Sequence, residues 1–92
     1  MTPRQGKASL LLVDDDPDML RLLSIRLKAN GYDVTAVDSA QRALAAISAA
    51  RPDLVLTDLR MEGMDGMALF HEIQASYPGL PVIILTAHGS IP

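Results

Sequence analysis

The sequence contains no cysteine and no tryptophan, and aromatic residues make up only 3% of the chain. The absence of cysteine excludes disulfide bonds and thiolate metal sites. It also agrees with a reducing compartment, so we expect a cytoplasmic protein. Because aromatic side chains are scarce, aliphatic side chains and methionine must fill the core.

Other scarce features exclude further classes of protein. No apolar run approaches the roughly 20 residues that cross a bilayer, and residues 1–8 lack the apolar segment of a secretory signal. We therefore expect no membrane association. The net charge of −3 gives no electrostatic reason to expect nucleic-acid binding. With 49% hydrophobic residues, the chain is typical of a packed domain, which we place at residues 9–92 after a flexible lead-in at residues 1–8.

The most informative stretch is Leu10 to Asp16, in which four apolar residues lead directly into three aspartates. An uninterrupted apolar run predicts a strand that is buried on both faces, as in parallel sheets. Unpaired charges are costly to bury, so the aspartates must lie beyond the carboxyl end of the strand. Adjacent carboxylates repel one another. A hard divalent cation with oxygen ligands would relieve that repulsion.

Strand and helix patterns alternate along the rest of the chain. The expected strands are 9–14, 32–37, 53–58 and 81–85, and the expected helices are 17–29, 40–50 and 66–77. Asp16 and Pro17 form a typical helix start, because aspartate caps the helix and proline suits its first position. This alternation predicts an α/β fold with a parallel sheet and right-handed crossovers. Residues 32–37 alternate in polarity and are expected at an edge.

Polar residues stand at the ends of three of these strands. Asp14 and Asp15 follow the first strand, Asp58 ends the third, and Thr86 ends the fourth. In open α/β sheets, ligands bind outside the carboxyl ends of the strands. We therefore expect these four side chains to converge on one rim of the sheet.

The same residues resemble the motifs of the receiver domain of two-component response regulators. The matching segments are residues 12–16, 53–61, 64–66 and 81–87. The separations of 43 residues between Asp15 and Asp58 and of 28 residues between Asp58 and Thr86 agree with that family. Residues 60–61 and 85–89 look most similar to the nitrogen regulator C and GlrR-like branch, which regulates sigma-54 transcription.

The resemblance implies a flavodoxin-like, doubly wound fold and a role for each motif residue. Asp58 would accept a phosphoryl group from a sensor histidine kinase, and Thr86 would be the switch hydroxyl. Asp14, Asp15, Asp58 and the backbone carbonyl of Arg60 would bind Mg²⁺. Such a domain is not an enzyme with a separate substrate, although it catalyses its own phosphorylation and dephosphorylation. It would control a transcriptional output domain that is absent from this sequence.

Two features depart from the family pattern. Glu62 stands where proline is common, which affects the rigidity of the loop rather than the chemistry. The sequence ends at Pro92, before the fourth helix, the fifth strand and the fifth helix of a receiver. The family lysine and an aromatic switch residue are therefore missing, which should weaken phosphorylation or signalling. We expect an incomplete fold that self-associates through the exposed edge of strand 81–85.

Two other functions remain open from the sequence. A haloacid-dehalogenase-like, Mg²⁺-dependent phosphohydrolase also carries aspartates at strand ends, but Pro17 and Asp18 after Asp14-x-Asp16 fit its signature poorly. A receiver fragment that cannot be phosphorylated would act only through protein interactions. The missing C-terminal elements favour that second alternative over the first.

Overall fold

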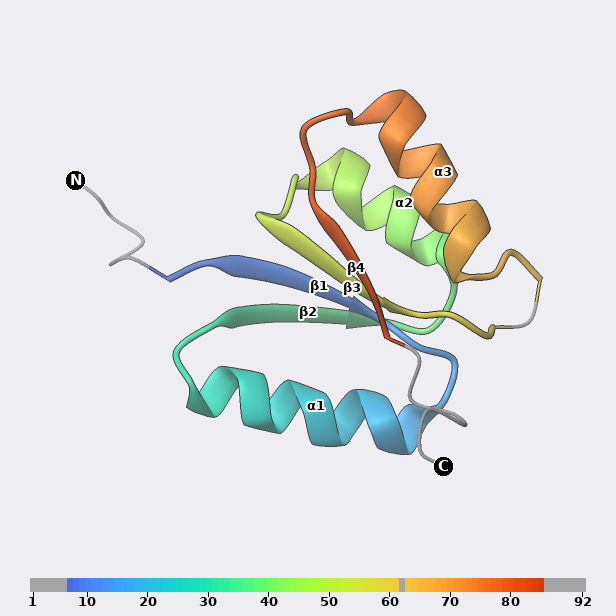
Figure 1. Cartoon of the computed structure of the whole chain (residues 1–92). Helices are drawn as coiled ribbons and strands as arrows, with labels where there is room; N and C mark the ends of the chain where they lie inside the picture. The colour runs from blue at the N-terminus through green and yellow to red at the C-terminus, as the bar shows by residue number, and fades with distance from the viewer. Residues whose placement is uncertain (1–6, 62, 86–92) are drawn as a thin grey trace.

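A computed structural model of the chain describes residues 7–61 and 63–85, in which strands and helices alternate (Figure 1). The elements are β1 (Ser9–Val13), α1 (Pro17–Ala29), β2 (Asp33–Val37), α2 (Ala40–Ala49), β3 (Leu54–Asp58), α3 (Gly66–Ser76) and β4 (Val82–Leu85). Every expected element is confirmed, and no end differs by more than one residue. Most of the expected lead-in, residues 1–8, lies outside the described residues.

The four strands form one parallel sheet with the order β2-β1-β3-β4. This arrangement confirms the predicted flavodoxin-like α/β fold. Strand β2 lies at one edge, as its alternating pattern predicted, and β4 lies at the other edge among the described residues. All four carboxyl ends therefore point to the same rim of the sheet. No helix in the described part of the chain is long and apolar enough to cross a membrane.

Short polar residues start each helix beside this rim. The Asp16 carboxylate accepts hydrogen bonds from the backbone N–H groups of Asp18 (3.0 Å) and Met19 (3.4 Å) at the start of α1. Ser39 caps α2, and Asp65 caps α3. These caps satisfy donors that the first turn of a helix leaves free. They hold the helix starts next to the strand ends that carry the acidic residues.

One face of the sheet is covered by α2 and α3, and we call it the closed face (Figure 1). Its core consists of Leu11, Val13, Ala40, Ala43, Ile47, Val55, Leu69, Ile73 and Leu80. The inward positions of α2 are mostly alanine, so this helix can approach the sheet closely. The absence of large aromatic side chains from this core agrees with the composition.

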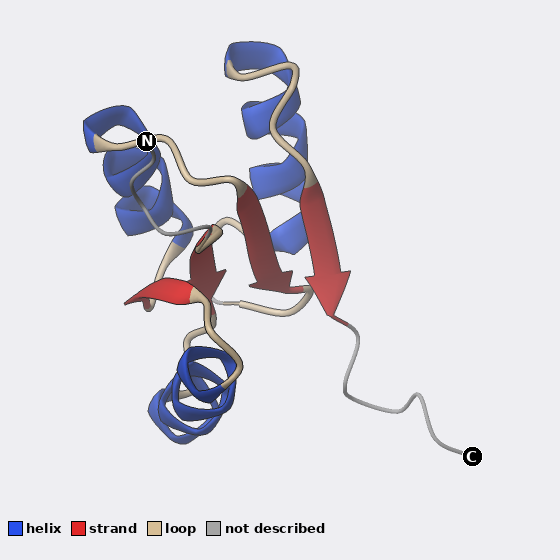
Figure 2. Ribbon diagram, turned by 90° about the vertical axis from the view of Figure 1, so that its left-hand side faces the viewer, coloured by secondary structure: helices blue, strands red, loops and turns tan. Residues whose placement is uncertain are grey.

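The opposite face carries α1, and we call it the open face. Helix α1 contacts β1 and β2, and Figure 2 shows it beneath that side of the sheet. Leu12 of β1 is completely buried, whereas Ile83 of β4 is 47% exposed. No residue of α1 is fully buried, and Leu22 and Ile25 are both exposed. The β4 side of this face thus presents apolar side chains to solvent.

Candidate functional site

The acidic residues that the sequence placed at strand ends meet at the predicted rim. Asp14 follows β1 and Asp58 ends β3, and these strands are paired so that Val13 lies opposite Thr57. One carboxylate oxygen from each of Asp14, Asp15 and Asp58 lies within 4.8 Å of the other two. The predicted convergence is therefore confirmed for these three residues.

The three carboxylates differ in exposure. Asp14 and Asp58 are only 7% and 5% exposed, whereas Asp15 is exposed to solvent. Asp14 is held by two hydrogen bonds: its N–H donates to the carbonyl of Val37 (3.2 Å), and its carboxylate accepts from the N–H of Asp16 (3.0 Å). The first bond extends the pairing between β1 and β2 past the end of β1. The second bond turns the Asp14 side chain toward the rim.

The local electrostatics disfavour three negative charges in this place. Burial raises the pKa of Asp14 above its ordinary value, and the negative charges of Asp58, Asp15 and Asp16 raise it further. The hydrogen bond from the Asp16 N–H partly opposes this rise. An ionised Asp14 is therefore stabilised by any positive charge that enters between the carboxylates.

The donor set fits a hard divalent cation. All three groups offer carboxylate oxygens, which are the ligands that Mg²⁺ and Ca²⁺ prefer. The exposed Asp15 leaves the site open to water, and Mg²⁺ usually keeps several water ligands. Within residues 7–61 and 63–85, this is the one group of three metal-ligating side chains that lie so close together.

The backbone after Asp58 is tied to its neighbours by three hydrogen bonds. The Thr57 hydroxyl donates to the carbonyl of Asp58 (3.0 Å), and the N–H of Leu59 donates to the carbonyl of Leu85 (3.1 Å). The N–H of Gly66, the first residue of α3, donates to the carbonyl of Leu59 (2.9 Å). Thr57 and Gly66 thus contact the backbone that carries the Asp58 carboxylate.

The sequence assigned no role in the site to these two residues. Residues 64–66 belong to the segments that resemble the receiver family, but Asp65-Gly66 by itself predicts no more than a loop end and a helix start, because aspartate and glycine are common there. The available signal was a glycine placed inside the first turn of a helix, where it costs stability relative to alanine. Such a glycine indicates a close approach of two backbones. Thr57 had no comparable signal, because threonine is common in strands.

For two further predicted site residues, the described geometry does not test the predicted role. Arg60 lies in the loop after β3 and is exposed, and the role of its carbonyl as a metal ligand stays a prediction. Thr86 lies outside the described residues, and so does Glu62. The role of Thr86 as the switch hydroxyl therefore also stays a prediction.

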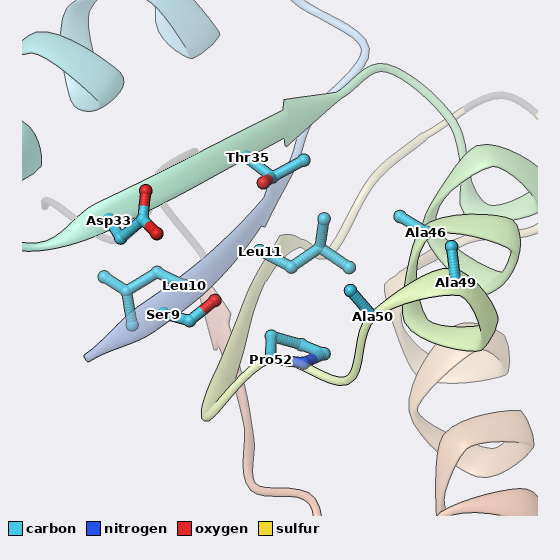
Figure 3. Close-up of a pocket in the computed structure, with 9 residues that line it drawn as sticks. All are labelled: Ser9, Leu10, Leu11, Asp33, Thr35, Ala46, Ala49, Ala50 and Pro52. Atoms are coloured by element: carbon cyan, nitrogen blue, oxygen red, sulfur yellow. The ribbon is translucent and has the colours of Figure 1, made fainter. Parts of the chain in front are cut away.

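A pocket of about 360 Å³ lies at the opposite ends of the strands (Figure 3). It is lined by Ser9, Leu10, Leu11, Asp33, Thr35, Ala46, Ala49, Ala50 and Pro52. Ser9 and Asp33 begin β1 and β2, so the pocket faces away from the carboxyl-end rim. Its walls are mainly apolar, with Asp33 as the one acidic side chain among the lining residues. This pocket is separate from the acidic site.

Known proteins share this sequence pattern. The chain matches the family described as the response regulator receiver domain over residues 10–92. The transcriptional regulatory protein GlrR of Escherichia coli K12 is 58% identical over 85 residues, which cover 92% of this chain and 19% of GlrR. The transcriptional regulator NtrC of Salmonella typhimurium is 41% identical over 80 residues, which cover 87% of this chain and 17% of NtrC. The chain thus spans about a fifth of the length of these relatives.

Solved structures share the fold as well. The response regulator TrrA of Thermotoga maritima, solved in complex with Mg²⁺ and BeF, has a TM-score of 0.85 and 30% sequence identity. The match covers 89% of this chain and 71% of TrrA. Both the resemblance to receivers and the likeness to the nitrogen regulator C and GlrR-like branch are confirmed. From its matched residues, its parallel sheet and its relatives, the chain belongs to the response regulator receiver domain family.

Proposed function

We propose that Asp58 accepts a phosphoryl group from a sensor histidine kinase, with Mg²⁺ held by Asp14, Asp15, Asp58 and the backbone carbonyl of Arg60. The supporting observation is the approach of the three carboxylates within 4.8 Å at the carboxyl-end rim. Membership of the receiver family supports the same role, because these domains are regulatory modules of two-component systems. The proposed phosphoryl donor is a phosphohistidine.

The chemistry follows from the placement of Asp58. A carboxylate oxygen of Asp58 attacks the phosphorus atom, the phosphorus–nitrogen bond of the phosphohistidine breaks, and its electron pair returns to the histidine. A bound Mg²⁺ would neutralise charge on the phosphoryl oxygens, which otherwise repel the attacking carboxylate. Asp14 and Asp15 would hold the cation beside Asp58. The hydrogen bonds of the Asp58 carbonyl and the Leu59 N–H limit the motion of Asp58 during the attack.

We further propose that the phosphorylated domain controls a transcriptional output domain in the cytoplasm. GlrR and NtrC are transcriptional regulators, and about four fifths of their length is not covered by this chain. The absence of cysteine fits a reducing compartment.

The open edge of β4 supports self-association as a second mode of interaction. Strand β4 has one neighbour among the described residues, and Ile83 in its middle is 47% exposed. An apolar, unpaired strand edge is a template for pairing with another chain. We propose that two copies pair through their β4 edges, which light scattering at increasing protein concentration would detect. A monomer at every concentration would contradict this pairing.

Intact-mass measurement tests the proposed phosphorylation. The chain is mixed with acetyl phosphate and Mg²⁺, and we expect one added phosphoryl group. Asp58→Asn should abolish the adduct, because an amide cannot replace the nucleophilic carboxylate. Asp38→Asn is the matched control, because Asp38 is exposed and pairs with Arg42 on α2.

The other outcomes identify the alternatives. Release of phosphate without an adduct would support a phosphohydrolase instead. Neither adduct nor phosphate release would indicate a receiver fragment that acts only through protein interactions. An adduct that persists in Asp58→Asn would place the phosphoacceptor elsewhere.

A further inference from the structure

We infer that Thr57 and Gly66 are positioning residues that hold the peptide group between Asp58 and Leu59, and thereby aim the Asp58 carboxylate at the other two acids of the rim. The inference rests on the proposed role of Asp58 as the phosphoacceptor. It adds two residues, neither of which would touch the phosphoryl group. Thr57 lies on the closed face of the sheet, and Gly66 is the first residue of α3.

The first support comes from inside the closed face. Thr57 is completely buried, and its hydroxyl donates to the carbonyl oxygen of Asp58 at 3.0 Å. A buried hydroxyl needs a partner, and here the partner belongs to the residue that carries the reacting carboxylate. The bond restricts rotation of the carbonyl at the very end of β3.

The second support comes from α3. A Cβ atom added to Gly66 would overlap the carbonyl oxygen of Asp58, and it would lie 3.0 Å from Cα of Leu59 and 3.1 Å from the carbonyl carbon of Asp58. All three are backbone atoms, so no side-chain rotation can relieve the overlap. Any larger residue at this position must push α3 and the Asp58–Leu59 peptide apart.

We call the contacts of Thr57 and Gly66 with the Asp58–Leu59 peptide group the clamp. Two backbone hydrogen bonds hold the same region in place. The N–H of the clamped peptide, which belongs to Leu59, donates to Leu85 of β4 at 3.1 Å. The next carbonyl, that of Leu59, accepts from the N–H of Gly66 at 2.9 Å. The clamped peptide is attached directly to Cα of Asp58, so a displacement of the peptide moves the carboxylate with it. A displacement of about 1 Å at a reacting group can cost on the order of 100-fold in rate.

The test compares Gly66, the first residue of α3, with Gly63 in the loop that precedes it. Gly66→Ala should slow phosphoryl uptake from acetyl phosphate, at saturating Mg²⁺, by about 100-fold. Gly63→Ala is the matched control, because Gly63 has a positive φ of +76° that disfavours alanine, but nothing lies within 4 Å of its added Cβ. We expect Gly63→Ala to lose stability and to keep its uptake rate within about threefold when it is fully folded.

A second pair of variants addresses Thr57. Thr57→Val removes the hydroxyl at nearly constant shape and should slow uptake about tenfold, the size that loss of one hydrogen bond produces. Thr57→Ser keeps the hydroxyl and should restore the rate, although it loses a buried methyl group. Urea unfolding of each variant separates an effect on uptake from an effect on stability.

The outcomes decide between positioning and simple packing. If uptake falls in step with stability across all four variants, the two residues only pack the structure, and the inference is overturned. If Gly66→Ala does not fold, the contrast between Thr57→Val and Thr57→Ser decides alone, and equal rates overturn the inference.

The affinity for Mg²⁺, measured by calorimetry, keeps this inference apart from the proposed function. If the unmodified chain takes up no phosphoryl group, the proposed function fails for this chain. Weaker Mg²⁺ binding in Gly66→Ala and Thr57→Val, but not in Gly63→Ala and Thr57→Ser, would then still support the clamp. Equal affinities would overturn it, and a chain that neither takes up phosphoryl groups nor binds Mg²⁺ would overturn both.

Discussion

The two faces of the sheet differ in how completely they are covered. On the closed face, Val55 of β3 and Leu69 and Ile73 of α3 are completely buried. On the open face, α1 covers the β1 and β2 side, and Ile83 of β4 remains 47% exposed (Figure 2). The supports of Asp58 come from the closed side. The residues that contact the backbone of Asp58 thus belong to the well-packed half of the molecule, whereas the β4 side of the open face exposes apolar surface.

The largest effect is expected from a substitution that breaks the closed face. Leu69→Ala should lower the free energy of unfolding by about 2–5 kcal/mol, because it removes a completely buried side chain and leaves a cavity. Leu22→Ala is the same substitution on α1, where the side chain is 49% exposed, and should cost about 1 kcal/mol or less. Urea unfolding measures both values. Equal losses would show that the two faces contribute alike.

The next effect concerns the acidic rim itself. Mg²⁺ at about 100 times its dissociation constant should raise the free energy of unfolding by about 2.7 kcal/mol, because only the folded chain brings the three carboxylates together. EDTA should remove this gain, and Asp15→Asn should reduce it. Asp38→Asn changes an exposed aspartate after β2 that lies outside the group of three carboxylates, and it should leave the gain unchanged. A gain that persists in Asp15→Asn would place the cation elsewhere.

A smaller effect is expected on the open face. Ile83→Lys should weaken self-association by about tenfold or more in dissociation constant, because a lysine at a strand edge disfavours pairing with another strand. Sedimentation analysis over a range of protein concentrations measures this change. Ile25→Lys is the control, since Ile25 is exposed on α1 rather than on β4. Equal effects of the two substitutions would indicate association through α1 instead.

The smallest effect is a pH dependence at Asp14. Its pKa is raised in the folded chain, chiefly by burial. At a pH below the pKa that Asp14 has in the unfolded chain, Asp14 is protonated in both states and does not change the free energy of unfolding. As the pH rises through the raised folded pKa, the folded chain must ionise a carboxylate that is already ionised when unfolded, so the free energy of unfolding falls.

This dependence is measured by urea unfolding in EDTA at several pH values. Asp14→Asn should be relatively more stable than the unmodified chain at neutral pH, and its stability should fall less as the pH rises. Asp38→Asn should follow the unmodified chain. A steeper loss of stability with pH in Asp14→Asn would contradict the assignment.

Much of the site was predictable, because its main signal is local. An apolar strand that runs directly into carboxylates places them at the strand end, as for Asp14 and Asp58. In a parallel sheet all such ends share one rim, so the approach of the acids followed once the alternation of strands and helices was recognised. The role of Thr86 and the carbonyl of Arg60 remain predictions.

The supports of the site were not predictable for an equally physical reason. The contact between Gly66 and the Asp58 carbonyl exists because α3 packs against the end of β3 at one particular distance. The glycine in the first helical turn indicates that some backbone comes close, but not that this backbone is the end of β3 or how close it lies. The hydrogen bond of Thr57 likewise depends on which side of β3 faces the core.

The sequence by itself determined the order of the elements, their ends and the rim on which the aspartates lie, because capping residues and apolar runs act over a few neighbouring positions. Only the tertiary structure decided that the two faces are covered unequally and that α3 clamps the peptide after Asp58. Burial and close approach depend on which distant segments lie against a residue. No local pattern in the chain encodes those distances.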